Sequence, residues 1–556
     1  MMRNRRLLHL FGSVKFLLRP SVRKCHSTGA SLTFPKNIPL PLYLLGEAST
    51  YGDQVAMINA DTGQKFRYDN LQGDSIKVSN SFFRLGLRRG DVVCLYGSNT
   101  PEMLPIFCGV TAIGGIISPA MTQMSVVELT NQLRDCRAKF LITTPECVIR
   151  AKAASEKCDN IQEVIVLGQA EGCRPFSDLI KTAKLSFPDI SIDPSKDIAL
   201  MPYSAGISGK PKAVLLTHYN LISAIEALRQ PDFIPFEPGK DHNVMVFPVT
   251  HATGIVIGFG LSLIQGATII TLNRFEARSY LRALQKYNGT FTMTTPSMLW
   301  HLNNHPLLKE MDLSSLQTVF SQSAPLQPCL VEQLTKKLNV PHIRQGYGLT
   351  EACGVGLATP INDWKSGSVG VPIPGMEVKV IDPNTHEELS AGKEGEICLR
   401  GPSVAMKFWK SYNENENLLL GDGWIRTGDI GMCSAEGHYT IVDKIKSVIK
   451  YKGCQVSPEE IEDLLLNHPA VLDAAVIGLP DAEAGEVPTA LVVKQRNVDA
   501  KELQNFVSEN SASFKQLRGG IKFHPEIPRL PDGSISRRMI RDWFLEFHPL
   551  HARRAN

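Results

Sequence analysis

Short apolar runs and stretches of helical periodicity alternate along the chain from about residue 47. The apolar runs have the length and the β-branched content of buried strands, as at 92–99, 139–144, 163–168 and 268–272. Alternation of this kind predicts βαβ units, in which helices join parallel strands. We therefore expect an α/β fold whose large N-terminal domain contains parallel sheets.

The pattern changes near residue 370, where short alternating segments with turn residues begin, as in VGVPIPGMEVKVIDP and GEICLRGPSVA. These segments predict a smaller β-rich subdomain or a small β-barrel subdomain. After Asp443 the segment 457–471 predicts a helix that is capped by Ser457 and begins at Pro458. We expect a second, smaller α+β domain in this part of the chain.

An uncharged run at 243–273 is long enough to span a bilayer. It also contains His251, Gln265 and several glycines, and it ends in the β-branched sequence ATIITL. A buried helix followed by a buried strand explains this composition better than a membrane span does. We therefore expect no transmembrane segment.

The chain has 556 residues, 43% of them hydrophobic and 21% charged, which is typical of a globular protein with more than one core. Its formal net charge of +4 comes from residues 1–46, which hold eight Lys or Arg and no acidic residue. The remainder has 51 basic against 55 acidic residues, so we expect no nucleic-acid partner. The 12 cysteines include no C-x-x-C pair, and neither zinc nor disulfides are indicated.

Residues 1–46 combine arginines with Leu, Phe and Val and lack acids, as organelle transit peptides do. We expect this segment to be a transit peptide and leader that directs the protein to the mitochondrial matrix. The alternative is a disordered basic tail.

A loop rich in glycine and hydroxyl groups lies between two apolar stretches at 203–218. Small residues let backbone N–H groups converge on a phosphate, and Lys210 and Lys212 offset its charge. The glycine spacing differs from that of a Walker loop. The candidate phosphate-binding residues are Ser204, Gly206, Ser208, Gly209 and Lys212.

This loop resembles the phosphate-binding signature of the adenylate-forming enzymes, which include acyl-CoA synthetases, 4-coumarate-CoA ligases and firefly luciferase. Further matches occur in the family's order: QGYGLTE at 345–351, GWIRTGD at 423–429 and VDKIKSVIKYKGCQVSPEEIE at 442–462. The resemblance implies a large AMP-binding domain at 47–442 and a small mobile domain at 443–556, with a hinge at Asp443.

Enzymes of this family activate a carboxylic acid with ATP, and the CoA ligases among them then pass the acyl group to a thiol. The resemblance therefore implies ATP, Mg²⁺ and coenzyme A as cofactors or co-substrates, and a medium-chain fatty acid or an aryl acid as substrate. Two alternatives stay open: a nucleotide- or acyl-CoA-binding protein that has lost adenylation, and a luciferase-like oxygenase. No motif indicates the oligomeric state.

The resemblance also implies roles for individual residues. Thr350 would contact the α-phosphate and Glu351 would hold Mg²⁺. Tyr347 would pack on the adenine, and Asp429 would accept hydrogen bonds from the ribose hydroxyls. Lys444 stands where the family usually has Arg. The Lys444 ammonium would contact ribose or phosphate, but it lacks the planar guanidinium with which Arg donates two parallel hydrogen bonds.

Three residues match positions beside the acyl pocket: His251, Gln322 and Gly346. Gln322 replaces a glycine of the family pattern, and its size and polarity would reshape the pocket. Lys450 and Gln455 match positions used in the adenylate and thioester steps.

This chain departs most from the family at the signature Pro-x-x-x-x-Gly-Lys, which corresponds to residues 528–534. Ser534 replaces the lysine that, in the family, bridges the carboxylate and the phosphate. A positioned cation strongly stabilises the transition state in a desolvated site, so we expect slower adenylation. Lys522, Arg529 and Arg537 are the nearby cations that would substitute for the missing lysine.

Overall fold

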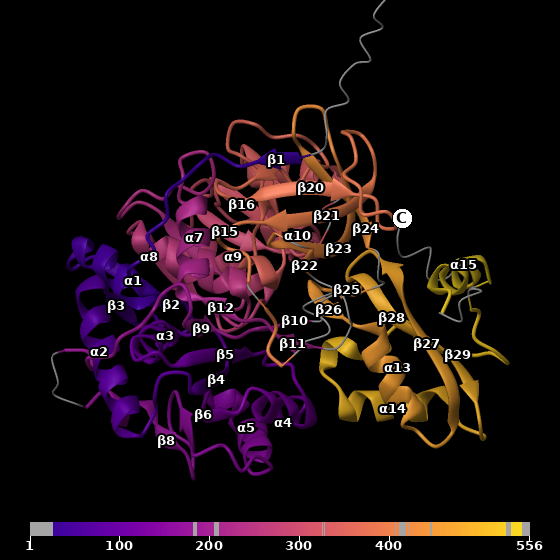
Figure 1. Ribbon diagram of the computed structural model, residues 1–556, viewed down its shortest axis with the longest axis horizontal. Helices are drawn as coiled ribbons and strands as arrows, with labels where there is room; N and C mark the ends of the chain where they lie inside the picture. The colour runs from indigo at the N-terminus through magenta and orange to yellow at the C-terminus, as the bar shows by residue number, and fades with distance from the viewer. Residues whose placement is uncertain are drawn as a thin grey trace, which may run out of the picture.

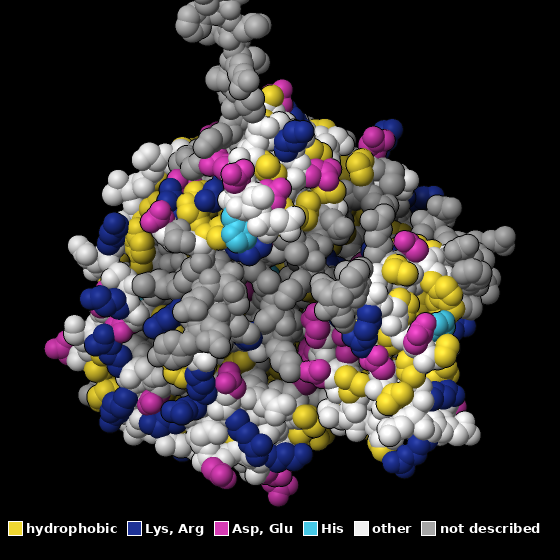
Figure 2. Space-filling view, turned by 45° about the vertical axis from the view of Figure 1, so that its right-hand side comes forward, with side chains coloured by type: hydrophobic (Ala, Val, Ile, Leu, Met, Phe, Trp, Pro, Cys, Tyr) yellow, Lys and Arg dark blue, Asp and Glu magenta, His cyan; other side chains and the backbone are white. Residues whose placement is uncertain are grey.

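The computed structural model describes most of the chain: residues 26–181, 186–204, 211–324, 326, 328–405, 407–410, 419–420, 422–444, 448–529 and 535–547. Two large sheets and an antiparallel sheet make up the larger part, and the yellow C-terminal part forms a separate, smaller body (Figure 1). This arrangement confirms the predicted α/β class with a large N-terminal domain and a smaller C-terminal domain. On the face shown in Figure 2, basic side chains are interspersed with acidic and neutral ones.

The first large sheet has the strand order β12-β9-β5-β4-β6-β7-β8, and its central strands are parallel. Its strands are β4 (Val92–Tyr96), β5 (Ile116–Ala120), β6 (Ala138–Thr143), β7 (Glu163–Val166), β8 (Arg174–Pro175), β9 (Ile198–Leu200) and β12 (Leu216–Thr217). Its connecting helices are α3 (Met103–Thr111), α4 (Val126–Asp135), α5 (Val148–Ser155) and α6 (Phe176–Leu179). Strands β4, β6 and β7 confirm three of the predicted apolar strands.

The second large sheet has the order β19-β18-β17-β16-β15-β13-β14-β2-β3. Its strands are β2 (Val55–Asn59), β3 (Lys65–Arg67), β13 (His242–Met245), β14 (Thr268–Thr271), β15 (Phe291–Thr294), β16 (Thr318–Ser321), β17 (His342–Tyr347), β18 (Leu357–Ala358) and β19 (Val371–Pro372). Helices α9 (Ala277–Lys286), α10 (Pro296–Asn304) and α11 (Pro328–Leu338) connect its strands. Because β15, β16 and β17 are parallel, their carboxyl ends meet at one edge.

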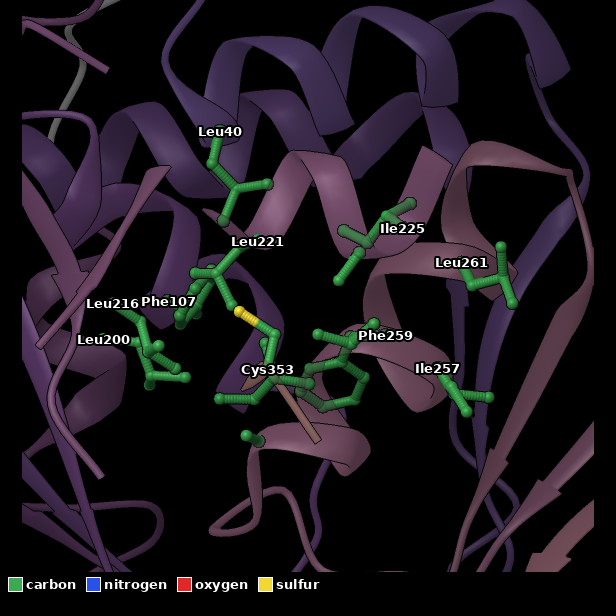
Figure 3. Packing of buried hydrophobic residues seen from close by; sticks show 14 of the residues in the cluster. Leu40, Phe107, Leu200, Leu216, Leu221, Ile225, Ile257, Phe259, Leu261 and Cys353 are labelled. Carbon is green, nitrogen blue, oxygen red and sulfur yellow. The ribbon is translucent and has the colours of Figure 1, made fainter. Parts of the chain in front are cut away.

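A layer of helices packs against the two large sheets. It contains α1 (Leu40–Ala48), α2 (Tyr68–Arg84), α7 (His218–Leu228), a π-helix (Gly254–Leu261) and α8 (Ser262–Ile264). Figure 3 shows Leu221 and Ile225 of α7 pointing into the core that Phe259 of the π-helix also enters. The uncharged run thus forms a buried helical segment followed by strand β14, as predicted. Among the helices described, none combines the length and the apolar character that crossing a membrane requires.

The antiparallel sheet has the order β1-β20-β21-β23-β22, with β24 paired to β23. Its strands are β1 (His26–Thr28), β20 (Glu377–Ile381), β21 (Gly395–Arg400), β22 (Leu419–Leu420), β23 (Trp424–Cys433) and β24 (Tyr439–Lys444). It occupies the part of the chain where the alternating pattern predicts a β-rich subdomain.

The predicted leader of residues 1–46 overlaps with this folded part. Strand β1 pairs with β20, and helix α1 buries Leu40, Leu44 and Leu45 in the large domain. The structure therefore places residues 26–46 in the fold, because their apolar side chains have partners there. Residues 1–25 lie outside the described part of the chain.

The smaller body has a mixed sheet of β26-β25-β28-β27 with β29 paired to β28. Its elements are β25 (Ile449–Tyr451), β26 (Cys454–Val456), α13 (Pro458–Leu466), β27 (Val471–Asp481), β28 (Gly485–Lys494), α14 (Ala500–Asn510), β29 (Ile521–Phe523) and α15 (Arg537–Phe547). The Ser457 hydroxyl accepts a hydrogen bond from the Glu460 amide at 3.4 Å, which confirms the predicted cap of α13.

Candidate active site

The two ends of the glycine- and hydroxyl-rich loop form a short antiparallel pair, β10 (Tyr203–Ser204) and β11 (Lys212–Ala213). Ser204 lies opposite Lys212 in this pair. The Tyr203 hydroxyl donates a hydrogen bond to Asp135 Oδ2 at 2.6 Å and ties the loop base to the end of helix α4. The predicted phosphate-binding residues Gly206, Ser208 and Gly209 lie outside the described residues.

The loop base contacts a single helical turn, Thr350–Ala352, that follows strand β17. Glu351 in this turn is 4% exposed, and its carbonyl accepts a hydrogen bond from the Ala405 amide at 2.7 Å. Cys353, which ends the turn, has a left-handed backbone conformation with a φ of 53°. Thr350 and Glu351 lie at the carboxyl edge of the second sheet, beside the loop base, because they follow closely on β17.

Tyr347 and Asp429 meet at the same edge. The Tyr347 hydroxyl donates a hydrogen bond to Asp429 Oδ2 at 2.7 Å, and the Asp429 amide donates to Thr427 Oγ1 at 3.1 Å. Asp429 is 2% exposed. Burial raises the pKa of Tyr347 well above its ordinary value, and the nearby Asp429 carboxylate raises it further, so the phenol is a proton donor at neutral pH.

Lys444 is the register partner of Asp429 in the β23–β24 pair. The structure therefore places the backbone of Lys444 next to that of Asp429, while the Lys444 side chain lies outside the described part of the chain. Asp443 occupies the preceding position of the same strand.

His251 and Gln322 are connected through two other residues. His251 Nδ1 lies 3.1 Å from Thr253 Oγ1, and burial lowers the pKa of His251 to about 4, so the ring is neutral at pH 7. Gln322, at the end of β16 and 3% exposed, donates through Nε2 to the carbonyl of Gly354. Gly354 has no room for a side chain, since a Cβ there would lie 2.3 Å from Thr253 Oγ1.

Gly346 lies on the same sheet edge, directly before Tyr347. A Cβ at Gly346 would approach the Phe320 ring to 2.5 Å, so close packing between β17 and β16 requires a glycine here. The predicted acyl-pocket residues therefore come from three segments that meet at this edge.

Lys450 and Gln455 are register partners in the β25–β26 hairpin of the smaller body. The Lys450 amide donates to Glu486 Oε2 at 2.9 Å. The turn of this hairpin reaches the large domain, because the Cβ position of Gly453 lies 2.8 Å from Thr295 Cγ2, directly after β15. The hairpin thus meets the same sheet edge as the other candidate residues.

Comparison with known families decides where the chain belongs. The family model for AMP-binding enzymes matches residues 46–409, and the model for the AMP-binding enzyme C-terminal domain matches residues 460–533. This chain is a member of the AMP-binding enzyme family.

Similar AMP-binding enzymes cover nearly the whole chain. 4-Coumarate-CoA ligase 2 of Petroselinum crispum is 33% identical over 516 residues, 91% of this chain and 94% of the relative. Probable 4-coumarate-CoA ligase 1 of Dictyostelium discoideum is 32% identical over 526 residues, 91% of this chain and 95% of the relative.

Solved structures have the same fold. A long-chain-fatty-acid-CoA ligase of Archaeoglobus fulgidus superposes with a TM-score of 0.75 at 26% identity and covers 90% of this chain and 99% of its own. ATP-bound MatB of Rhodopseudomonas palustris has a TM-score of 0.66 at 26% identity, with 91% and 99% coverage.

Arg529 and Arg537 form ion pairs within the C-terminal part of this AMP-binding enzyme. The sequence suggested both as substitutes for the missing lysine. Arg529 Nη2 lies 2.7 Å from Asp473 Oδ2, and Arg537 Nη2 lies 2.9 Å from Glu462 Oε2. Ser534 itself lies outside the described residues. In this arrangement both arginines stabilise the smaller body.

The sequence motifs did not indicate Thr253, Gly354 or Thr295, although all three shape this edge. Thr253 lies two residues after the predicted His251, and Gly354 lies three residues after the motif at 345–351, yet their mutual contact joins segments about one hundred residues apart. A signal for Thr295 was present in its position as the N-cap of α10, where its hydroxyl accepts a hydrogen bond from the Met298 amide at 3.3 Å.

Proposed function

We propose that this AMP-binding enzyme is an ATP-dependent acid:CoA ligase that forms an acyl-adenylate and then an acyl-CoA thioester. The hydrogen bond between Tyr347 and Asp429 carries the proposal, because it joins the two segments that would bind adenosine. The near full-length similarity to 4-coumarate-CoA ligases supports this activity.

Each candidate residue has a physical task in the first step. Asp429 accepts hydrogen bonds from the ribose hydroxyls, and the Tyr347 ring packs on the adenine. A carboxylate oxygen of the acid then attacks the α-phosphorus, a P–O bond forms, and pyrophosphate leaves with the electron pair of the broken bond. Thr350 and Lys212 stabilise the charge that develops on the α-phosphate.

Glu351 suits a magnesium site. Mg²⁺ is usually bound by one or two carboxylates together with substrate phosphates, and Glu351 is a buried carboxylate beside the base of the proposed phosphate loop. Glu351 would hold the ion against ATP, where Mg²⁺ neutralises phosphate charge.

The second step transfers the acyl group to coenzyme A. The thiolate sulfur attacks the acyl carbon of the adenylate, a C–S bond forms, and AMP leaves. Lys450 and Gln455 would serve these steps from the β25–β26 hairpin, after the small domain turns about Asp443. Domain limits of 47–442 and 443–556 belong to this proposal.

The proposed substrate is a medium-chain fatty acid or an aryl acid. Similarity to 4-coumarate-CoA ligases supports an aryl acid, and the fold shared with a long-chain-fatty-acid-CoA ligase supports a fatty acid. Gln322 limits the pocket because its side chain is buried and bonded to Gly354. The proposed location is the mitochondrial matrix, from the acid-free basic composition of residues 1–46.

The test is pyrophosphate release from ATP and Mg²⁺ with a panel of fatty and aryl acids, followed by thioester formation after coenzyme A is added. We expect both with at least one class of acid, and a matched Asp429→Ala variant is expected to lose both. ATP binding without pyrophosphate release would identify a binding protein instead. An oxygen-dependent product would identify an oxygenase.

A further inference from the structure

A buried ammonium group joins the small domain to the large one. Lys515 Nζ lies 2.6 Å from Glu128 Oε1 and 2.6 Å from Glu460 Oε1. Glu128 belongs to α4 of the large domain, whereas Glu460 belongs to α13 of the small domain. The Lys515 and Glu128 side chains are only 7% and 11% exposed, so solvent and salt screen this contact weakly.

Both carboxylates are held at the start of a helix. The Glu128 side chain accepts a hydrogen bond from the Ser125 amide at 2.8 Å and closes a capping box, and the Glu460 amide donates to Ser457. The capping box fixes the Glu128 side chain, and both carboxylates lie near a helix N-terminus, where the helix dipole favours negative charge. Burial lowers the pKa of Lys515, but the two carboxylates outweigh burial and the net shift is upward.

A second contact lies at the hairpin side of the same interface. The Ser297 hydroxyl donates to the Glu483 carbonyl at 3.1 Å, and His301 Nε2 lies 3.4 Å from Glu483 Oε1. Next to it, Gly453 packs on Thr295 so closely that a Cβ would clash. The small domain is therefore placed with its hairpin turn on the first turn of α10.

The opposite end of the small domain faces away from the large one. Figure 1 shows α15 at the outer side of the small domain. Arg529 pairs with Asp473 of β27, and Ile535 packs against the cluster that includes Ile540 of α15. In this pose the β25–β26 hairpin, with Lys450 and Gln455, faces the candidate site. The two ends of the 528–535 segment lie away from that site.

We infer that Lys515 is a positioning residue that clamps α13 onto α4, holds the small domain in this pose and so promotes the thioester step. The inference rests on the proposed function, in which the small domain alternates between an adenylating and a thioester-forming pose. Loss of the ammonium leaves the two acidic side chains of Glu128 and Glu460 facing each other without a cation between them, which favours separation of the two helices.

The test compares the full chain with Lys515→Met in the two half-reactions. We expect thioester formation from bound acyl-adenylate to slow by about tenfold or more, because one partner of a buried ion pair is lost. Pyrophosphate release is expected to stay within about twofold, since Lys515 touches neither ATP nor acid in the proposal. Hydrogen exchange of the backbone amides at 449–456 and at 295–298 is expected to be faster in Lys515→Met than in the natural chain.

Glu128→Gln and Glu460→Gln are the matched variants. Gln at 128 keeps an oxygen for the capping box and leaves Lys515 paired with Glu460, so only the charge across the interface is lost. We expect Glu128→Gln to reproduce both effects of Lys515→Met, and Glu460→Gln, which acts within the small domain, to have the smaller effect. Lys515→Arg is expected to recover part of the thioester rate.

Equal slowing of both half-reactions by Lys515→Met, or unchanged hairpin exchange and thioester rate in Glu128→Gln, would overturn the clamp. Hydrogen exchange does not depend on catalysis. A natural chain that releases no pyrophosphate with any acid, while Lys515→Met still loosens the hairpin, would therefore reject the proposed ligase activity and retain the clamp.

Discussion

The phenol of Tyr347 donates a hydrogen bond of 2.7 Å to Asp429 although 82 positions separate the two residues in the chain. Tyr347 ends strand β17 of the second large sheet, whereas Asp429 lies in β23 of the antiparallel sheet. Their contact fixes the ring that would cover adenine relative to the carboxylate that would bind ribose.

Removing this contact is expected to weaken ATP binding strongly and to slow the chemical step only slightly. In Tyr347→Phe the aromatic ring stays, but the loss of a hydrogen bond to a charged group should raise KM for ATP by about tenfold while kcat changes by less than about threefold. Tyr439→Phe is the control, since its buried hydroxyl donates to the Val378 carbonyl at 3.1 Å. Steady-state kinetics with varied ATP distinguish them, and an unchanged KM in Tyr347→Phe would contradict the assignment.

Glu351→Gln tests the magnesium site. Loss of the buried carboxylate is expected to raise the Mg²⁺ concentration for half-maximal pyrophosphate release by about tenfold or more at saturating ATP. Glu394→Gln, an exposed residue of the antiparallel-sheet region, is the matched control and should behave like the natural chain. An identical Mg²⁺ dependence in all three proteins would remove Glu351 from the site.

His218 predicts how stability depends on pH. Its Nδ1 accepts a hydrogen bond from the Leu40 amide at 3.1 Å, and burial lowers its pKa from 6.5 to about 4. As the pH falls below 6.5, His218 binds a proton in the unfolded chain but stays neutral in the folded chain. The free energy of unfolding therefore decreases between pH 6.5 and 4, by about 3 kcal/mol at most.

His218→Asn keeps an acceptor for the Leu40 amide but has no titrating group. We expect the melting temperature of this variant to fall less between pH 7 and pH 5 than that of the natural chain. Scanning calorimetry measures both decreases. A residual decrease should remain, because burial lowers the pKa of His251 in the same way. Equal losses in the two proteins would show that His218 does not control acid stability.

Ser534→Lys restores the cation of the family signature. Because a positioned positive charge stabilises the developing phosphate charge, we expect pyrophosphate release to increase by about tenfold or more. Arg529 and Arg537 are paired with Asp473 and Glu462 in this pose and do not supply that charge here. Ser534→Ala is the control and should match the natural chain. If Ser534→Lys also matches it, another residue already supplies the cation.

Two truncations test whether residues 26–46 are needed for folding. Deletion of residues 1–25 keeps β1 and α1, and we expect this chain to fold and stay soluble. Deletion of residues 1–46 removes β1 and most of α1, including the buried Leu40 and Leu44, and each such side chain contributes about 2 to 5 kcal/mol, so we expect insoluble protein. Equal stability of both truncated chains would contradict this. A fluorescent fusion of residues 1–46 that stays diffuse in cells would reject the mitochondrial location.

Local pattern determined much of this protein. Strands at 92–96 and 163–166 formed where short β-branched runs predicted them, because burial on both faces of a parallel sheet requires such runs. The Ser457 cap also followed from adjacent residues. Family motifs singled out Tyr347, Glu351 and Asp429 without any knowledge of their contacts.

Tertiary structure decided what depends on distant partners. No local pattern indicates that the Lys515 ammonium meets Glu128, 387 positions away, or that Gln322 bonds to Gly354, because such contacts arise only when separate sheets and domains pack. The pairing of β1 with β20 was equally hidden, since a three-residue strand is defined by its partner and hardly by its own composition. Sequence thus determined which chemical groups the chain carries and which segments form strands and helices. Packing alone decided which of those groups face one another.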